Sequence, residues 1–577
     1  MYASGLMKRA QRSADSRVWL RTAEIGAVLA VWVAAVAFIR PRGNFPIDDD
    51  WDFAIATWNF ARTGHFHFTE FTAVSLRAQV LWGALWTRLL GESFEVLRLS
   101  TLVLGAGTLA IIHATLARAG AGPRARVIAT AAFAFHPIFL WSACSFMTEV
   151  PFVFASALAL HCFVRGFDEE RSGWIAAGCA AAMTAWFVRQ TGVTLLAAPL
   201  LLALMRRRLR DAAMIGGSLL FFLALLLYKR DWLAGSPQEF SNHFQMWREA
   251  PFRLPQQLAV LDHYMTFNVQ NSALFFLPLT VPLVIAFMRR PRRPDVVIAA
   301  VAFVAILIRV QLLINRGLPM PYFVVPYCCD IFGGNILVDF GLGPQSMKGD
   351  YPFLMPWAAR IALTYVSAIV GSLLVWALLR RTPRTNAALL AAGTALFGSL
   401  ALLGSGLYVD RYSFDSPWPL VIVLALIVPW DSRPPRALAI GALVLIALFS
   451  TFSVQEYFAW NRARWTAVND LRARGVPVTE IDAGSEPFHY LEMAGRDQKM
   501  RRITQWGMAK PYMVRFATDP GQRVIARYPW TGWLGLHQAA LVVTYAEAAT
   551  GTSGSAAREP ANRREPAAAP APRAVSR

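Results

Sequence analysis

Long apolar segments separated by short polar ones recur along the first 455 residues of the chain. A helix needs roughly 20 apolar residues to cross a bilayer, within a range of about 17–25. By this criterion the chain holds about 13 candidate membrane-spanning helices, two of which, 191–205 and 417–430, are short for a span. The pattern therefore predicts an α-helical polytopic membrane protein. The candidate spans are 22–40, 97–117, 126–143, 147–164, 173–189, 191–205, 213–228, 272–288, 296–313, 354–379, 386–407, 417–430 and 437–453.

Basic residues gather in alternate connections between these segments. Loops on the cytoplasmic side of a membrane carry an excess of lysine and arginine. We therefore expect a cytoplasmic N-terminus, and an odd number of spans then places the C-terminus outside the cytoplasm. The basic residues are Lys8 to Arg21, Arg118, Arg124, Arg126, Arg165, Arg171, Arg206, Arg207, Arg208, Arg210, Arg289, Arg290, Arg292, Arg293, Arg380, Arg381, Arg384, Arg433 and Arg436.

The composition agrees with a membrane protein. Hydrophobic residues make up 56% of the chain and charged residues 16%, whereas ordinary soluble domains carry about a quarter charged residues. The formal net charge is +20, but the basic residues lie in short runs between apolar segments, so we expect a bilayer and no nucleic acid as partner. No cleavable signal peptide is evident, because the first apolar segment is long and no small-residue cleavage site follows it.

The polar segments on the predicted outer side include the longest ones. In the first of them, 41–96, the stretches Trp51–Thr63 and Ser75–Leu90 have the spacing of helices that lie along a membrane surface. Beyond residue 455 the polarity is mixed, with candidate strands at Val478–Asp482 and Ala539–Tyr545. The predicted units are a cytoplasmic N-terminus (1–21), a transmembrane domain (22–455), a small extracytoplasmic α/β domain (456–547) and a disordered tail (548–577).

Four carboxylates lie within five residues, directly after the first apolar helix: Asp48, Asp49, Asp50 and Asp52. Neighbouring carboxylates repel, so at least one should have a raised pKa or hold a cation. The alternative is an acidic turn that caps the next helix, because aspartate favours helix N-termini. Spacing alone leaves the two interpretations about equal.

A second carboxylate, Glu149, lies on the same predicted face at the start of a span. A carboxylate just inside an apolar helix is costly, which makes it a functional candidate. The alternative is helix capping, because Thr148 and Pro151 both suit a helix start.

Arginines supply the opposite charge on this face. Arg411 and Tyr412 lie at a third outer junction, where they suit a lipid phosphate or, alternatively, an interfacial anchor belt. Arg309 lies inside a span, about 13 residues or roughly 20 Å from its cytoplasmic end. Arg189 ends another span on the outer face. Each of these two either reaches the same site or pairs with a buried carboxylate.

Common catalytic motifs are missing from the sequence. It contains no phosphate-binding glycine loop, HExxH motif, CxxC pair or nucleophile elbow. Chemistry driven by cytoplasmic nucleotide hydrolysis is therefore unsupported.

Taken in order, a set of motifs resembles the GT-C superfamily of membrane glycosyltransferases, in particular bacterial glycosyltransferase family 39 and the RgtA/B/C/D-like domain. The similarity is strongest over about residues 20–210, and the order and shared face of the motifs carry it. The first acidic motif is here a triple aspartate, and Glu149 stands where several relatives have aspartate. The motifs are Asp49-Asp50-Trp51, 57–64, Gln79–Leu85, Leu97–Gly105, Met147–Pro151, Asp410–Tyr412 and Tyr457–Gly484.

The resemblance implies a bacterial inner-membrane enzyme of cell-envelope glycan biosynthesis. Its donor would be a sugar on a polyprenyl phosphate, and its acceptor a hydroxyl of a glycan, lipid or protein outside the cytoplasm. An aspartate would act as general base in an inverting attack, with Asp49 the first choice and Asp50 and Glu149 the other catalytic candidates. The implied substrate-binding residues are Asp48, Arg309, Arg411, Tyr412 and Arg189.

Three questions stay open at this point. The sequence does not decide whether a divalent cation is a cofactor; its candidate ligands would be Asp49 and Glu149. A transporter or flippase of lipid-linked glycans would use the same charged residues, although the chain shows no internal symmetry of the kind transporters often have. A non-catalytic binding protein is the third interpretation, which the intact set of Asp49, Glu149 and Arg411 argues against.

Overall fold

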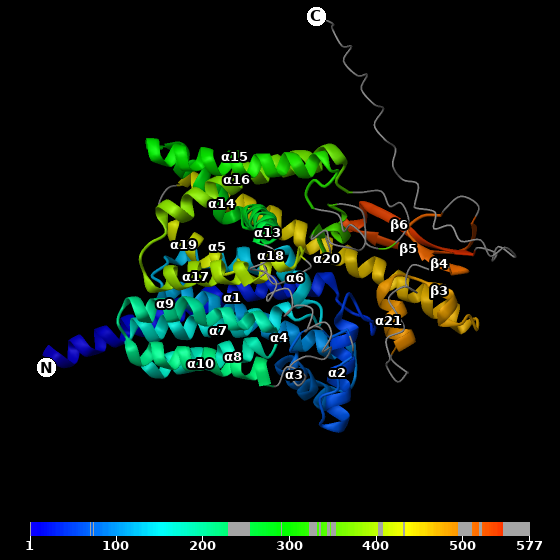
Figure 1. The fold of residues 1–577 in the computed structure, drawn as a ribbon, viewed down its shortest axis with the longest axis horizontal. Helices are drawn as coiled ribbons and strands as arrows, with labels where there is room; N and C mark the ends of the chain where they lie inside the picture. Colours follow the sequence, from blue (N-terminus) through cyan, green and yellow to red (C-terminus); the bar gives the residue numbers. More distant parts are fainter. Residues whose placement is uncertain are drawn as a thin grey trace, which may run out of the picture.

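The computed structural model describes residues 2–69, 71–72, 74–228, 254–289, 291–321, 332–333, 336–342, 347, 354–401, 408–430, 433–493, 510–518 and 522–545. The tail predicted at 548–577 lies outside these residues. Figure 1 shows a mostly helical molecule in which long helices run side by side. The N-terminus lies at one end of the bundle, and α2, α3 and the C-terminal strands lie toward the other.

Among the described residues, six helices are long and apolar enough to cross a membrane. The number rises to 8 if each of two sharply bent pairs is one span, namely α5 (Pro123–Ala134) with α6 (Pro137–Ala143), and Tyr264–Phe275 of α13 (Leu254–Phe275) with α14 (Leu277–Arg289). The prediction of a multi-pass helical membrane protein is confirmed. The six are Leu20–Ile39 within α1 (Tyr2–Ile39), α4 (Phe94–Arg118), α7 (Glu149–Asp168), α15 (Arg293–Asn315), α16 (Trp357–Arg381) and α20 (Arg433–Ala473).

The predicted number of about 13 spans is higher than the six to eight found by length and composition in the described residues. Several predicted spans form shorter helices, in part because proline or a tight turn interrupts them. Segment 417–430 begins with two prolines and forms only eight residues of helix. Segment 191–205 begins within the short helix η1 (Gln190–Leu196), where Gly192 packs so closely against the end of α8 (Ser172–Trp186) that a Cβ there would lie 2.4 Å from the backbone nitrogen of Trp186. The other apolar helices are α8, η1, α9 (Ala197–Met205), α10 (Leu209–Tyr228), α17 (Asn386–Ala401) and α19 (Leu420–Ile427).

The two predicted surface helices are present. They are α2 (Asp50–Thr63) and α3 (Arg77–Leu90), which pack against each other. α2 ends at Gly64, whose φ of 73° favours glycine. Leu81, Leu85 and Leu89 form an exposed row along α3, at the spacing of one helix face. This apolar row suits a helix that lies on a membrane surface.

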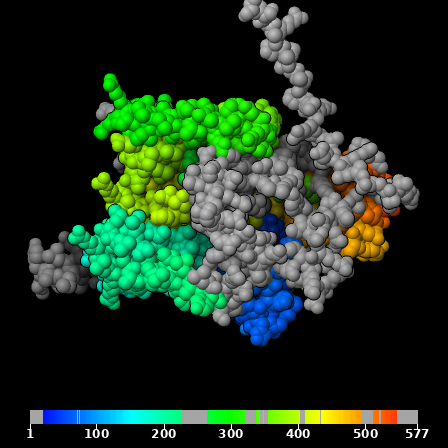
Figure 2. All heavy atoms as spheres, viewed as in Figure 1, coloured from blue at the N-terminus to red at the C-terminus, as the bar shows by residue number. Residues whose placement is uncertain are grey.

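The C-terminal region forms the predicted small sheet, a four-stranded one in the order β3-β4-β6-β5. Only the β3–β4 pair is parallel. α20 is a single helix that runs through the predicted domain boundary at 456, and β5 packs against it. Figure 2 shows α2 and α3 (blue) and these strands (orange) away from the cyan and green helices. The elements are β3 (Ile481–Asp482), α21 (Ser485–Met493), β4 (Tyr512–Arg515), β5 (Arg523–Gly532), η7 (Trp533–Gly535) and β6 (His537–Tyr545).

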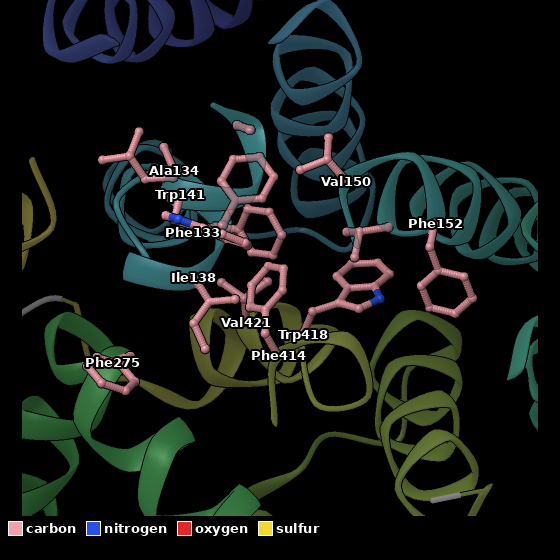
Figure 3. Packing of buried hydrophobic residues seen from close by; sticks show 14 of the residues in the cluster. Phe133, Ala134, Ile138, Trp141, Val150, Phe152, Phe275, Phe414, Trp418 and Val421 are labelled. Atoms are coloured by element: carbon pink, nitrogen blue, oxygen red, sulfur yellow. The ribbon is translucent and has the colours of Figure 1, made fainter. Parts of the chain in front are cut away.

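A buried aromatic cluster joins the early and late halves of the bundle. The ring of Phe414, in α18 (Tyr412–Asp415), lies 5.4 Å from the ring of Phe133 in α5 and 4.6 Å from that of His136. Figure 3 shows Phe414 and Trp418 among the side chains of α5 and α6. Large aromatic side chains contribute strongly to burial energy. This packing fixes the short helix that follows Arg411.

Candidate active site

The acidic segment after α1 is held from inside by a buried arginine. Arg98, in α4, donates hydrogen bonds to the carbonyl oxygens of Gly43 (2.8 Å) and Phe45. Asp48 at the tip of the loop has a φ of 53°, in the left-handed region. α2 begins at Asp50, directly after this turn. The loop geometry thus depends on a charge supplied from the membrane-spanning part of the chain.

Two of the four aspartates serve the local structure. Asp50 accepts hydrogen bonds from the backbone nitrogens of Ile47 (2.7 Å) and Phe146 (3.5 Å). Asp52 accepts from the hydroxyls of Thr69 and Thr72, the latter at 2.7 Å. Both carboxylates are buried, and burial raises the pKa of Asp50 to about 7 and that of Asp52 to about 6. Neither side chain caps α2, whose N-cap residue is Asp49 and has no side-chain capping bond, but both hold the segment in place through these contacts.

The other two aspartates contact Arg411. Its Nη1 lies 2.9 Å from Asp48 Oδ2, and its Nη2 lies 2.7 Å from Asp49 Oδ2. The side chain of Asp49 is 51% exposed, whereas that of Asp48 is mostly buried. Burial raises the pKa of Asp48 and the charge of Arg411 opposes that rise. Asp49 is therefore the one carboxylate of the segment that combines an arginine partner with access from outside.

Glu149 is the first residue of α7 and its side chain is fully buried, at 0% exposure. Its Oε1 lies 3.4 Å from Nη1 of Arg189 and 3.7 Å from Nε of Arg411. Thr148 makes no side-chain capping bond. Within the described residues, Oε2 of Glu149 has no hydrogen-bond partner, and an unsatisfied buried carboxylate oxygen is costly. This oxygen is a polar group that a bound molecule would satisfy.

Arg189 and Tyr412 complete the site. The guanidinium of Arg189 pairs with Asp415 and lies 5.1 Å from the ring centre of Tyr412. Arg411 lies 6.0 Å from the same ring. Asp410 accepts hydrogen bonds from the backbone nitrogens of Ile336 and Leu337, at 3.2 and 2.6 Å, and so anchors the segment before Arg411.

Arg309 is not a member of the ion pairs described above. It lies in α15, one helical turn before Leu313. The side chain of Leu313 belongs to the same apolar cluster as that of Tyr412. α15 therefore borders the site on the Tyr412 side, and the predicted role of Arg309 stays a prediction.

Sequence reasoning missed the residues that connect the acidic segment to the C-terminal region. Glu486, in α21, accepts a hydrogen bond from the backbone nitrogen of Asp48 (3.3 Å) and pairs with Arg464 (3.0 Å). The ring of His489 stacks on that of Trp51 at 5.3 Å with an interplanar angle of 6°. No local pattern announces these contacts, because Glu486 lies 438 residues after Asp48. Asp415 was also missed, although it lies in the same short helix as Tyr412.

The charges of the site do not balance. Asp48, Asp49, Glu149 and Asp415 give four negative charges when ionised, and Arg189 and Arg411 give two positive ones. Among the residues that the structure describes, no group of three or more His, Cys, Asp or Glu side chains has the spacing of a metal site. A cation shared by Asp49 and Glu149 would have to take the place of Arg411, which contacts both.

Comparison with known proteins shows that part of the chain matches one family model. Residues 81–228 match the family model described as dolichyl-phosphate-mannose-protein mannosyltransferase. Over this stretch the chain is similar to a family of GT-C membrane glycosyltransferases. The matched stretch contains Glu149 and Arg189 of the site, while the acidic segment and Arg411 lie outside it. This confirms the resemblance predicted from the motifs.

Two solved structures are similar to this chain at 14% sequence identity. They are crystal structures of ArnT from Cupriavidus metallidurans, one in the apo state and one bound to undecaprenyl phosphate. The alignments cover 92% of this chain and 98% and 100% of those chains, with a TM-score of 0.40 in each case. A TM-score this low assigns neither a fold nor a ligand to the chain. No curated protein matches it.

Proposed function

We propose that the protein is an integral membrane glycosyltransferase. It would move a sugar from a polyprenyl-phosphate donor to an acceptor hydroxyl on the extracytoplasmic face, with inversion at the anomeric carbon. The observation that carries the proposal is the pairing of Arg411 with the half-exposed Asp49 and with the buried Asp48 and Glu149. This arrangement supplies a carboxylate base and a phosphate-binding guanidinium within one site.

Asp49 is the proposed general base. Its carboxylate takes the proton of the acceptor hydroxyl while that oxygen forms a bond to the anomeric carbon. The bond between the anomeric carbon and the phosphate oxygen breaks at the same time, and the lipid phosphate leaves with the electron pair. Asp50 suits this role less, because two backbone nitrogens occupy its buried carboxylate.

Arg411 is the proposed binding residue for the departing phosphate. A guanidinium matches phosphate oxygens with two parallel hydrogen bonds, and a preorganised cation stabilises charge that develops during the reaction. Arg189 lies against the same ring of Tyr412 and adds a second positive charge. The description of the matched family, which names a lipid-phosphate-linked sugar, supports a donor of this class.

The distribution of charged loops supports an extracytoplasmic site. Arg118 pairs with Glu169, and Asn386 donates to Asp168, so several of the predicted cytoplasmic connections meet in space. Arg165, from the same set, also pairs with Glu169. Because arginine-rich connections favour the cytoplasm, this clustering supports an outward-facing position for the end that bears α2, α3 and the sheet.

The test is sugar transfer by the full-length protein in proteoliposomes that contain a radiolabelled polyprenyl-phosphate donor pool. We expect Asp49→Asn to lower the rate about 10²–10⁴-fold, the range for loss of a general base, while donor binding is retained. Glu92→Gln is the matched control, because Glu92 forms an exposed pair with Arg62 away from the site. Equal transfer by Asp49→Asn and wild type would overturn the assignment of the base. If the wild-type protein moves the donor across the membrane but transfers no sugar, the protein is a flippase and the proposal of an enzyme is wrong.

A further inference from the structure

A cavity lies between the end of α1, the C-terminal half of α20 and the turn between β5 and β6. Its volume is about 820 Å³. On α20 it is lined by Gln455, Ala459, Arg462 and Thr466, which are three or four residues apart and so share one helix face. Arg464, which reaches toward the candidate active site through Glu486, lies on a different face of the same helix. The cavity is therefore separate from the site of Asp49 and Arg411.

The wall of this cavity carries two arginines. Arg40 and Arg462 both line it, and Nη1 of Arg462 donates a hydrogen bond to the carbonyl oxygen of Arg40 at 3.1 Å. In the described part of the chain, neither guanidinium forms an ion pair with a carboxylate. Tyr528 also lines the cavity, but its hydroxyl donates to Asp470 (2.8 Å). Two like charges facing one cavity repel unless an anion lies between them.

The wall of the cavity also contains exposed apolar side chains. Phe38 and Leu534 line the cavity, and Leu534 is 67% exposed. Trp533 packs on Phe452 at 5.5 Å, and Phe452 in turn contacts Phe38 at 5.8 Å. Trp533, Leu534 and Gly535 have φ values of 50°, 56° and 86°, so the turn adopts left-handed backbone to present these side chains.

The position of the cavity relates it to the bilayer. The apolar span within α1 ends at Ile39, directly before Arg40. A span end marks the level where hydrocarbon gives way to lipid headgroups, and arginine is favoured there. An exposed leucine beside the span end is suited to the acyl-chain side of this boundary. The cavity wall thus combines positive charge with exposed apolar side chains, which suits a ligand with a charged head and apolar chains.

We propose that this cavity binds the phosphate headgroup of an anionic membrane lipid. The phosphate lies between Arg40 and Arg462, whose guanidiniums bind phosphate oxygens with paired hydrogen bonds. The acyl chains pass along Phe38 and Leu534 into the bilayer. Basic pockets beside membrane-spanning helices recognise anionic headgroups by the same chemistry. Free inorganic phosphate shares this chemistry and is the competing source.

The test measures lipid binding by the full-length protein in detergent, with native mass spectrometry as the readout. Dioleoylphosphatidylglycerol is titrated against wild type, Arg40→Gln/Arg462→Gln and the control Arg527→Gln, an exposed arginine of β5 outside the cavity. We expect the double variant to lose affinity about ten-fold or more, because charge-assisted hydrogen bonds to phosphate are strong. The control should bind as wild type does, and dioleoylphosphatidylcholine should bind more weakly because it carries no net charge.

Two further measurements separate the alternatives. Arg40→Gln alone changes an exposed side chain, so it stays informative if the double variant does not fold. Leu534→Ser should lower the affinity for the lipid. It should not change the effect of sodium phosphate on the melting temperature. Lipid affinity that is unchanged in both arginine variants would overturn the proposal. If sodium phosphate competes with the lipid and Leu534→Ser does not change lipid affinity, the proposal of a lipid site is wrong and the cavity is a site for a phosphate ion.

Discussion

The acidic segment that follows α1 has two halves with opposite environments. Asp48 and Asp49 contact a guanidinium, and Asp49 is open to the outside. Asp50 and Asp52, one and three residues further along, are enclosed and bonded to backbone nitrogens and threonine hydroxyls. The first half is arranged to meet a ligand and the second to hold the segment in place. Adjacent residues of the same type thus acquire different roles from what surrounds them.

The largest effect expected from this comparison is at Arg411. Arg411→Gln leaves Asp48, Asp49 and Glu149 without their shared cation. Removing one partner of a buried ion pair typically costs about 3–5 kcal/mol, so we expect lower stability as well as loss of transfer. Thermal unfolding in detergent and the transfer assay are the measurements.

Arg411→Lys is the matched variant for this change. It keeps the positive charge but loses the planar fork, so stability should recover more than activity does. If Arg411→Gln unfolds at the wild-type temperature, the guanidinium does not neutralise the first half of the segment.

Changes around Asp50 and Asp52, the second half of the segment, should alter the stability of the protein but not its rate of sugar transfer. Thr72→Val removes a hydroxyl that donates to the buried Asp52. An unsatisfied buried acceptor costs about 1–3 kcal/mol, and we expect a loss of that size in the free energy of unfolding. Transfer per folded molecule should stay at the wild-type level. A catalytic defect in fully folded Thr72→Val would show that the two halves are not separate.

The sequence contained enough to predict the class of fold and the face on which the charged residues meet. Apolar length and loop charge are local properties, so the helical bundle and the surface helices could be read from them. The division of the apolar segments into long and short helices was less predictable, because a hydropathy run does not reveal turns such as the one where Gly192 packs against the end of α8. The division of the four aspartates was not predictable either. It depends on Thr72 from the following loop, Phe146 from another turn and Arg411 from the far end of the chain.

The pH dependence of stability tests the enclosed half further. The pKa values of Asp50 and Asp52 are raised to about 7 and about 6, so the folded state binds protons more tightly than the unfolded state does. Stability from these groups is therefore present at low pH and is lost as the pH rises from about 4 to about 7. We expect a higher melting temperature near pH 5 than near pH 8. Asp50→Asn should flatten this slope, and Asp49→Asn serves as the control that keeps Asp50 and Asp52 in place.

The smallest effect should come from the contact between α21 of the C-terminal region and α2, which begins within the acidic segment. His489→Ala removes the ring that stacks on Trp51, one residue after Asp50. Aromatic pairs contribute about 0.5–1.5 kcal/mol beyond their burial, so the melting temperature should fall only slightly. The backbone nitrogen of Asp48 would still donate to Glu486, and transfer should persist with a modestly raised KM. Phe488→Ala is the comparison variant: the Phe488 ring contacts that of His489 edge-on, with 5.1 Å between the ring centres, and has no stacking contact with Trp51 among the described rings. A KM change as large in Phe488→Ala would assign the effect to α21 as a whole, whereas a change confined to His489→Ala would show that the C-terminal region positions the acidic segment through this stack.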